Sequence, residues 1–259
     1  MVIFGLSLRE EPHDPAFVAH LPGFCRLLEV PGSVLDSLQL RRGMADKCGE
    51  LKAEWGVRDL IDAGLAQRLA EEGESLRFEA LRKFESRARS ALECGAAWAS
   101  FDLDAGRAVV DAEYGRKALV LVRQLGGILE KLKHDWPLYI PVRIPAPGEA
   151  AEPSRLLKFF HELALPQFAP AFELHPHEPG ALAWDGMEKL RFAARFWRIC
   201  FDPTSGNKLA PTALSRFLAD DGLAPEPLKI LFSPEGASAA DDYTMEQLSE
   251  TAEKWGKTS

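Results

Sequence analysis

Short apolar runs alternate along this chain with longer stretches of helical periodicity. The clearest helical stretch covers residues 74–94, where apolar residues recur at spacings of three and four from Leu76 to Leu92. The same periodicity predicts helices over residues 111–134, 154–163, 186–194, 211–220 and 244–255. Apolar runs closed by Pro, Gly or charged residues predict strands over residues 2–8, 24–30, 96–103, 138–144, 169–175, 196–202 and 228–232. Strands that alternate with helices indicate a parallel sheet with helical crossovers.

The third strand of this series is predicted from alternation alone. In residues 50–55, charged residues alternate with Leu51, Ala53 and Trp55, but the segment has no β-branched residue. With it the chain has eight strands, and eight such units close into a barrel of about 250 residues, close to the 259 residues present. We therefore predict a single α/β domain over residues 1–259, a (β/α)8 TIM barrel that is irregular around the third strand if residues 50–55 are helical or coiled.

Polar residues fall on one face of the strands, toward their C-terminal ends. In the run Phe172, Glu173, Leu174, His175, alternation places Glu173 and His175 on the same face of a strand. In a barrel of this type the catalytic groups gather at the C-terminal ends of the strands. The same alternation nominates Ser7, Arg9, Glu29, Ser100, Asp102, Tyr139, Arg143, Arg198, Cys200 and Asp202.

These residue types suit acid–base chemistry beside a cation. Carboxylate and imidazole ligands together suit a divalent metal, and an arginine fork suits a carboxylate or phosphate. We predict Glu173, His175 and Asp102 as catalytic groups, Glu173, His175 and Asp202 as metal ligands, and Arg9, Arg143, Arg198 and Glu29 as substrate-binding residues.

Two alternatives remain open at this point. Arg143 and Arg198 equally suit a structural role as partners of buried acids. Cys200 could be a nucleophile, but no motif places a base beside it, and a buried cysteine is usually inert core.

Composition narrows the classes of function. The 31 Lys and Arg residues against 39 Asp and Glu residues give a net charge of −8, which argues against a broad basic face for nucleic acid. The four cysteines form no CxxC pair, the N-terminus lacks the features of a signal peptide, and no apolar run reaches about 18 residues. We expect a cytoplasmic protein that binds neither nucleic acid nor membranes; its oligomeric state is open.

Three segments resemble one family of barrels. Residues 23–30, 91–98 and 201–207 resemble the second strand, a helix-to-strand junction and the end of the seventh strand of the xylose isomerase-like barrels. This superfamily contains sugar isomerases, sugar-phosphate epimerases and endonuclease IV. The resemblance implies an isomerase or epimerase for a sugar or sugar-derived anion, with a divalent metal such as Mn²⁺, Zn²⁺ or Mg²⁺.

The chain departs from the family pattern at the metal site. Family members bind the metal through a glutamate after the fifth strand, an aspartate on the sixth, a histidine or aspartate on the seventh and a glutamate on the eighth. Here Arg143 stands near the place of the first glutamate, and Glu235 is the nearest acid to the eighth strand. The alternative is therefore a catalytically inactive barrel without a metal, which binds an anionic small molecule or a protein partner. Net charge and the small number of histidines disfavour an endonuclease.

Overall fold

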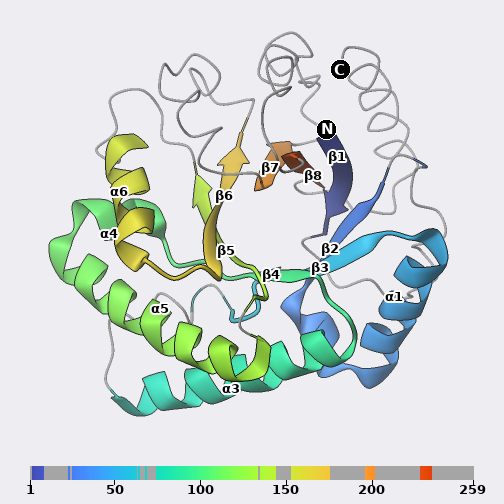
Figure 1. Cartoon of the computed structure of the whole chain (residues 1–259), viewed down its shortest axis with the longest axis horizontal. Coiled ribbons are helices and arrows are strands. Elements are labelled where there is room, and N and C mark those ends of the chain that lie inside the picture. The colour runs from blue at the N-terminus through green and yellow to red at the C-terminus, as the bar shows by residue number, and fades with distance from the viewer. Residues whose placement is uncertain are drawn as a thin grey trace, which may run out of the picture.

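Eight parallel strands close into a barrel in the order of the sequence (Figure 1). The computed structural model describes residues 2–8, 23, 25–62, 64, 68, 74–133, 135–143, 153–175, 196–201 and 228–234. Its strands are β1 (Val2–Ser7), β2 (Leu27–Pro31), β3 (Glu54–Arg58), β4 (Trp98–Ser100), β5 (Leu138–Arg143), β6 (Phe168–Leu174), β7 (Phe196–Phe201) and β8 (Leu228–Pro234). Strand β8 pairs with β1 and completes the ring. The predicted TIM barrel is therefore confirmed.

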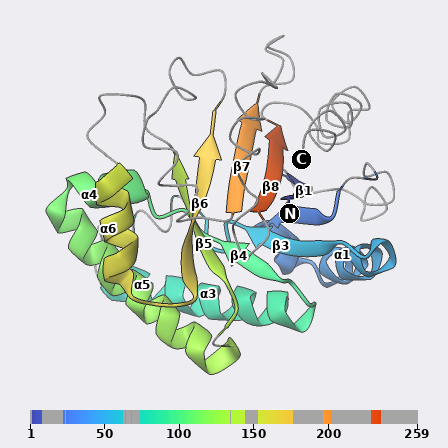
Figure 2. The ribbon, with the colours of Figure 1, turned by 45° about the horizontal axis from the view of Figure 1, so that its top comes forward.

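Helices lie outside the ring of strands (Figures 1 and 2). They are the 3-10 helix η2 (Gly32–Asp36), α1 (Leu38–Leu51), α3 (Glu74–Glu93), α4 (Ala105–Val110), α5 (Ala112–Lys133) and α6 (Pro153–Leu163). The helices predicted over 74–94, 111–134 and 154–163 are confirmed with ends shifted by a residue or so, whereas those predicted over 186–194, 211–220 and 244–255 fall outside the described residues. Among the described helices, none has the length and apolar character needed to cross a membrane.

The third strand lies further along the chain than residues 50–55, so that prediction is wrong. Helix α1 continues to Leu51, and the chain then turns at Lys52, whose φ is 54°. The charged residues of 50–55 alternate as they would in a strand, but Glu50 and Leu51 lie on the exposed side of the end of α1. Strand β3 is regular, because all five of its residues pair in register with β2. The expected irregularity is therefore absent from this strand.

The apolar core has two parts. The larger part packs between strands and helices and includes Phe172, Trp197 and Ile230. The smaller part lies inside the barrel and contains Leu27, Trp98, Ala171, Phe196 and Leu231. These five residues precede the polar lumen residues by two positions on their strands, so they fill the lumen below them.

A glycine gives the lumen tryptophan its space. The ring of Trp98 lies against Gly56, and a Cβ atom added at residue 56 would stand 2.2 Å from Cε2 of Trp98. Only glycine leaves room for an indole ring at this distance. The bulky side chain closes the lower lumen, so the polar residues lie above an apolar floor.

Candidate active site

A buried polar layer follows directly above the apolar floor. Glu29 follows Leu27 by two residues on β2, and Arg198 follows Phe196 in the same way on β7. Both side chains are fully buried, as are the hydroxyl-bearing residues Ser7, Ser100 and Ser233 of β1, β4 and β8. Strand alternation alone therefore brings one acid, one guanidinium and three hydroxyl groups into the lumen.

Arg198 is the centre of this layer. Its Nε donates to Oε2 of Glu29 at 2.8 Å and its Nη2 to Oε1 of Glu29 at 2.6 Å, which makes the pair bidentate. Nη2 also donates to the hydroxyl of Ser100 at 2.7 Å, and Nη1 donates to Oε1 of Glu173 at 3.2 Å. A charge-assisted pair of this geometry is among the strong hydrogen bonds in proteins.

Burial and the neighbouring charges act on this pair in opposite directions. Burial alone would raise the pKa of Glu29, but the charge and hydrogen bonds of Arg198, helped by Arg58 and Ser7, outweigh it and lower the pKa. Burial alone would lower the pKa of Arg198, but the charges of Glu29 and Glu173 outweigh this effect, so the pKa is raised. Both groups are therefore ionised at neutral pH, and their charges cancel.

Arg58 joins the layer from the C-terminal end of β3. Its Nη1 donates to the hydroxyl of Ser233 at 3.0 Å and to that of Ser7 at 3.2 Å, and its Nη2 reaches Oε1 of Glu173 at 3.5 Å. Its Nε stands 3.6 Å from Oδ2 of Asp59. Oε1 of Glu173 is thus shared between two guanidinium groups, which fix the orientation of this carboxylate.

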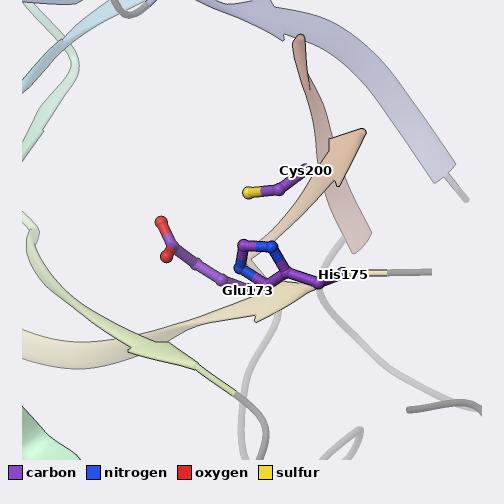
Figure 3. Close-up of side chains that lie close together, drawn as sticks. All are labelled: Glu173, His175 and Cys200. Carbon is purple, nitrogen blue, oxygen red and sulfur yellow. The ribbon is translucent and has the colours of Figure 1, made fainter. Parts of the chain in front are cut away.

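Glu173, His175 and Cys200 converge at the mouth, by which we mean the end of the barrel where the C-terminal ends of the strands meet. One potential ligand atom from each residue lies within 4.8 Å of the others. Figure 3 shows Glu173 and His175 extending from β6 toward the side on which the sulfur of Cys200 lies. Glu173 and His175 therefore share a face, as the alternation of this strand predicts.

Two further acids interact with the charge of Arg58. Asp102 follows β4, and its Oδ1 accepts a hydrogen bond of 2.9 Å from the backbone N–H of Asp104. Burial raises the pKa of Asp102, and the charge of Glu173 raises it as well. Burial also raises the pKa of Asp59, against the opposing charge of Arg58. A carboxyl group with a raised pKa retains its proton to a higher pH and can act as an acid.

Among the predicted arginines and Asp202, the structure describes Arg198 and Arg143. Arg198 is buried against Glu29 and Glu173, which is the structural alternative that the sequence left open, and this contact confirms the expectation that an arginine of the lumen pairs with an acid. Arg143 stands opposite Glu173 in the register of β5 and β6, with its side chain exposed at the rim. Arg9 and Asp202 lie outside the described residues.

Sequence reasoning missed Arg58 and left the role of Cys200 open between a nucleophile and inert core. Arg58 ends the run Glu54, Trp55, Gly56, Val57, which has the polar-tipped pattern of the other strands. The displaced third strand hid this pattern, because Arg58 then fell in a connection. The position of Cys200 beside His175 depends on the pairing of β6 with β7, which no local pattern encodes.

Comparisons with known proteins identify the fold. No protein-family model and no curated protein sequence matches the chain. Among solved structures, a 3-keto-D-glucoside 4-epimerase from E. coli has 12% identity and a TM-score of 0.67, with 99% of this chain and 100% of that chain covered. A putative xylose isomerase from Rhodospirillum rubrum has 11% identity and a TM-score of 0.68, with 100% of both chains covered. A D-psicose 3-epimerase from Clostridium cellulolyticum H10 has 10% identity and a TM-score of 0.65, with 99% and 97% covered. The chain therefore shares the TIM-barrel fold of these three proteins.

Proposed function

We propose that this chain is an isomerase or epimerase that acts on a sugar or a sugar-derived acid at the mouth of its barrel. The observation that carries the proposal is the convergence of Glu173, His175 and Cys200 within 4.8 Å at the end of the strands. Active sites of TIM barrels lie at this end. The solved structures with the same fold include epimerases of D-psicose and of a keto-glucoside, which supports a sugar as the substrate.

Proton transfer next to a carbonyl group is the reaction these side chains suit. A carboxylate or an imidazole can remove the proton, and Glu173 on β6 and His175 directly after this strand provide one of each on the same side. Asp102, whose pKa is raised by burial, can return a proton to the intermediate. Arg198 and Arg58 are positioning residues here, because they hold Oε1 of Glu173.

The donor atoms at the mouth also fit a divalent metal ion. Glu173 and His175 would hold it, with Asp202 as the third ligand predicted from the sequence, and Mn²⁺, Zn²⁺ and Mg²⁺ are the candidate ions. A bound cation would polarise the carbonyl oxygen of the substrate. Glu173 and His175 could not hold the ion and remove the proton at the same time, so with a metal bound Asp102 would be the acid–base group that remains.

Exchange with solvent tests this proposal. D-Tagatose, D-psicose, D-fructose and the sugar acid D-glucuronate are incubated with the protein in D2O, and loss of the C–H signal beside the carbonyl is followed by proton NMR. We expect exchange with at least one of them, and a reduction of roughly 100-fold or more in Glu173→Gln, because a positioned acid–base group contributes about that much. Glu113→Gln is the matched control, since Glu113 is 71% exposed on α5.

A barrel that binds an anion without catalysis is the second candidate. It is favoured by the guanidinium group of Arg58, which lies 3.5 Å from Oε1 of Glu173 and supplies positive charge near the mouth, whereas the charge of Arg198 is cancelled by Glu29. It predicts that none of the four compounds exchanges the hydrogen beside its carbonyl group. It also predicts that the protein binds D-glucuronate, and that Arg143→Met weakens this binding when it is measured by calorimetry. Exchange that depends on Glu173 contradicts this second candidate.

A further inference from the structure

Cys200 lies next to His175 on the neighbouring strand. The register of β6 and β7 pairs Glu173 with Arg198 and Leu174 with Ile199, so the following residues, His175 and Cys200, are neighbours. Both lie one alternation above the Glu173 and Arg198 pair and on the same face. A thiol therefore stands at the mouth beside an imidazole and a carboxylate, and the proton-transfer chemistry described above has no use for it.

The spacing of these donor atoms fits a small metal ion. Zinc bonds of about 2.0–2.3 Å in a tetrahedral site place ligand atoms roughly 3.3–3.8 Å apart. The three atoms lie within 4.8 Å of one another, so binding requires the widest separation to shorten by up to roughly 1.0–1.5 Å. Figure 3 shows the sulfur, the ring and the carboxylate arranged around one space.

The chemistry of the donors selects among metals. Thiolate is a soft ligand that favours zinc, imidazole suits zinc well, and Mg²⁺ and Mn²⁺ prefer oxygen ligands. Three protein ligands with a fourth position open to water or substrate are the usual arrangement of catalytic zinc sites. A set of Glu173, His175 and Cys200 therefore favours zinc over the other two candidate ions.

The surrounding charges permit a cation here. Arg198 is neutralised by its bidentate contact with Glu29, and Arg58 is accompanied by Asp59 at 3.6 Å. The carboxylate of Glu173 and a thiolate at Cys200 then supply two negative charges, which balance the two positive charges of Zn²⁺. Both guanidinium contacts engage Oε1 of Glu173, so the other oxygen can serve as the ligand while the arginines orient the carboxylate, as is usual for metal-binding carboxylates.

We propose that Glu173, His175 and Cys200 form a three-ligand zinc site with one open position. The inference concerns the mouth to which the proposed function is assigned and refines the metal of that function, replacing Asp202 by Cys200. Its test does not depend on turnover, so the zinc site and the proposed reaction can fail separately.

Cobalt provides a direct test of the thiolate ligand. The protein is stripped of metal with a chelator and titrated with Co²⁺, and the ultraviolet thiolate-to-cobalt charge-transfer band is recorded. We expect a band that saturates at one Co²⁺ per chain, is displaced by Zn²⁺ and is not displaced by an equal concentration of Mg²⁺ or Mn²⁺. Cys200→Ser should abolish the band.

Two variants complete the test. Cys48→Ser is the matched control, because it also removes a buried thiol, but one that lies in α1, away from the mouth. The charge-transfer band of Co²⁺ bound to this variant should be the same as that of the wild type. His175→Asn should weaken zinc binding by at least the roughly 10- to 100-fold that loss of a group supporting a metal ligand causes. Circular dichroism identifies any variant that fails to fold.

Distinct outcomes overturn the zinc site and the proposed reaction. Cobalt binding without the charge-transfer band, or zinc affinity that is equal in wild type and in folded Cys200→Ser and His175→Asn, overturns the zinc site. Solvent exchange of a sugar by protein that binds no zinc would then leave the proposed function standing. A saturable band without exchange of any sugar supports the zinc site and contradicts the proposed reaction.

Discussion

Arg198 and Glu29 form a bidentate ion pair across the lumen, with both side chains completely buried. They come from β7 and β2, and their two contacts measure 2.8 and 2.6 Å. Taking two charges out of water is costly, and the pair is tolerated because the partners satisfy each other and because Ser7, Ser100 and Glu173 satisfy further polar atoms. The barrel therefore depends on the pair remaining complete.

Glu29→Gln should strongly destabilise the fold. It leaves the guanidinium of Arg198 buried with a neutral partner, and breaking a buried ion pair in this way costs about 3–5 kcal/mol. Urea unfolding of wild type and variant measures the difference. The exposed pair of Glu85 and Arg89 on α3 is the control, and Glu85→Gln should cost no more than about 0.5 kcal/mol. Equal effects of the two substitutions would contradict the role given to the buried pair.

The contribution of Glu29 should depend on pH with a defined sign. Its pKa is lower in the folded protein than in the unfolded chain, since the charge and hydrogen bonds of Arg198 outweigh the effect of burial. The stabilisation is therefore complete above the unfolded pKa of about 4.3 and is lost as pH falls through the folded pKa. Urea unfolding from pH 7 to pH 3 should show the gap between wild type and Glu29→Gln narrowing below about pH 4.3. A gap independent of pH would refute this linkage.

Asp102→Asn should have the opposite pH dependence. Burial raises the pKa of Asp102 in the folded protein, so its ionisation disfavours folding once the pH rises above the unfolded pKa of about 3.9. The variant should be more stable than wild type at pH 7, and the difference should vanish in acid. Asp111→Asn is a control of opposite sign, because the backbone N–H of Tyr114 lowers the pKa of Asp111. Thermal unfolding at pH 7 and pH 3.5 measures both variants.

Gly56→Ala should perturb the floor of the lumen. The added Cβ would meet the ring of Trp98 at 2.2 Å, and overpacking of this kind typically costs about 1–3 kcal/mol. Gly127→Ala is the control, because a Cβ at that position of α5 has no atom within 4 Å, and alanine should stabilise the helix by about 0.5–1 kcal/mol. Thermal unfolding of the two variants should therefore shift in opposite directions.

Local pattern was enough to predict most of the barrel and part of the mouth. Alternation of apolar and polar residues placed Glu173 and His175 on one face, because the period of a strand is fixed by its backbone geometry. The third strand was misplaced, because the alternation in residues 50–55 also fits the end of a helix, and the turn at Lys52 carries no glycine to mark it. Arg58 was missed as a consequence.

The contacts between strands could not be predicted in the same way. The pairing of Arg198 with Glu29 joins residues 169 positions apart, and the meeting of Cys200 with His175 depends on the register of β6 and β7. Register is set by the packing of the whole barrel and by the lengths of the connections. A single sequence therefore predicts which residues face the lumen, but not which of them touch.

The buried pair also limits how this sequence can change over generations. Loss of either Arg198 or Glu29 alone leaves a charge stranded in the lumen, so a lineage that passes through a single replacement passes through a poorly folded protein. Replacement of both residues by apolar side chains of similar volume can be neutral or stabilising. Descendants of a common ancestor should therefore carry the arginine and the glutamate together or lack both, and positions 29 and 198 should vary as one unit.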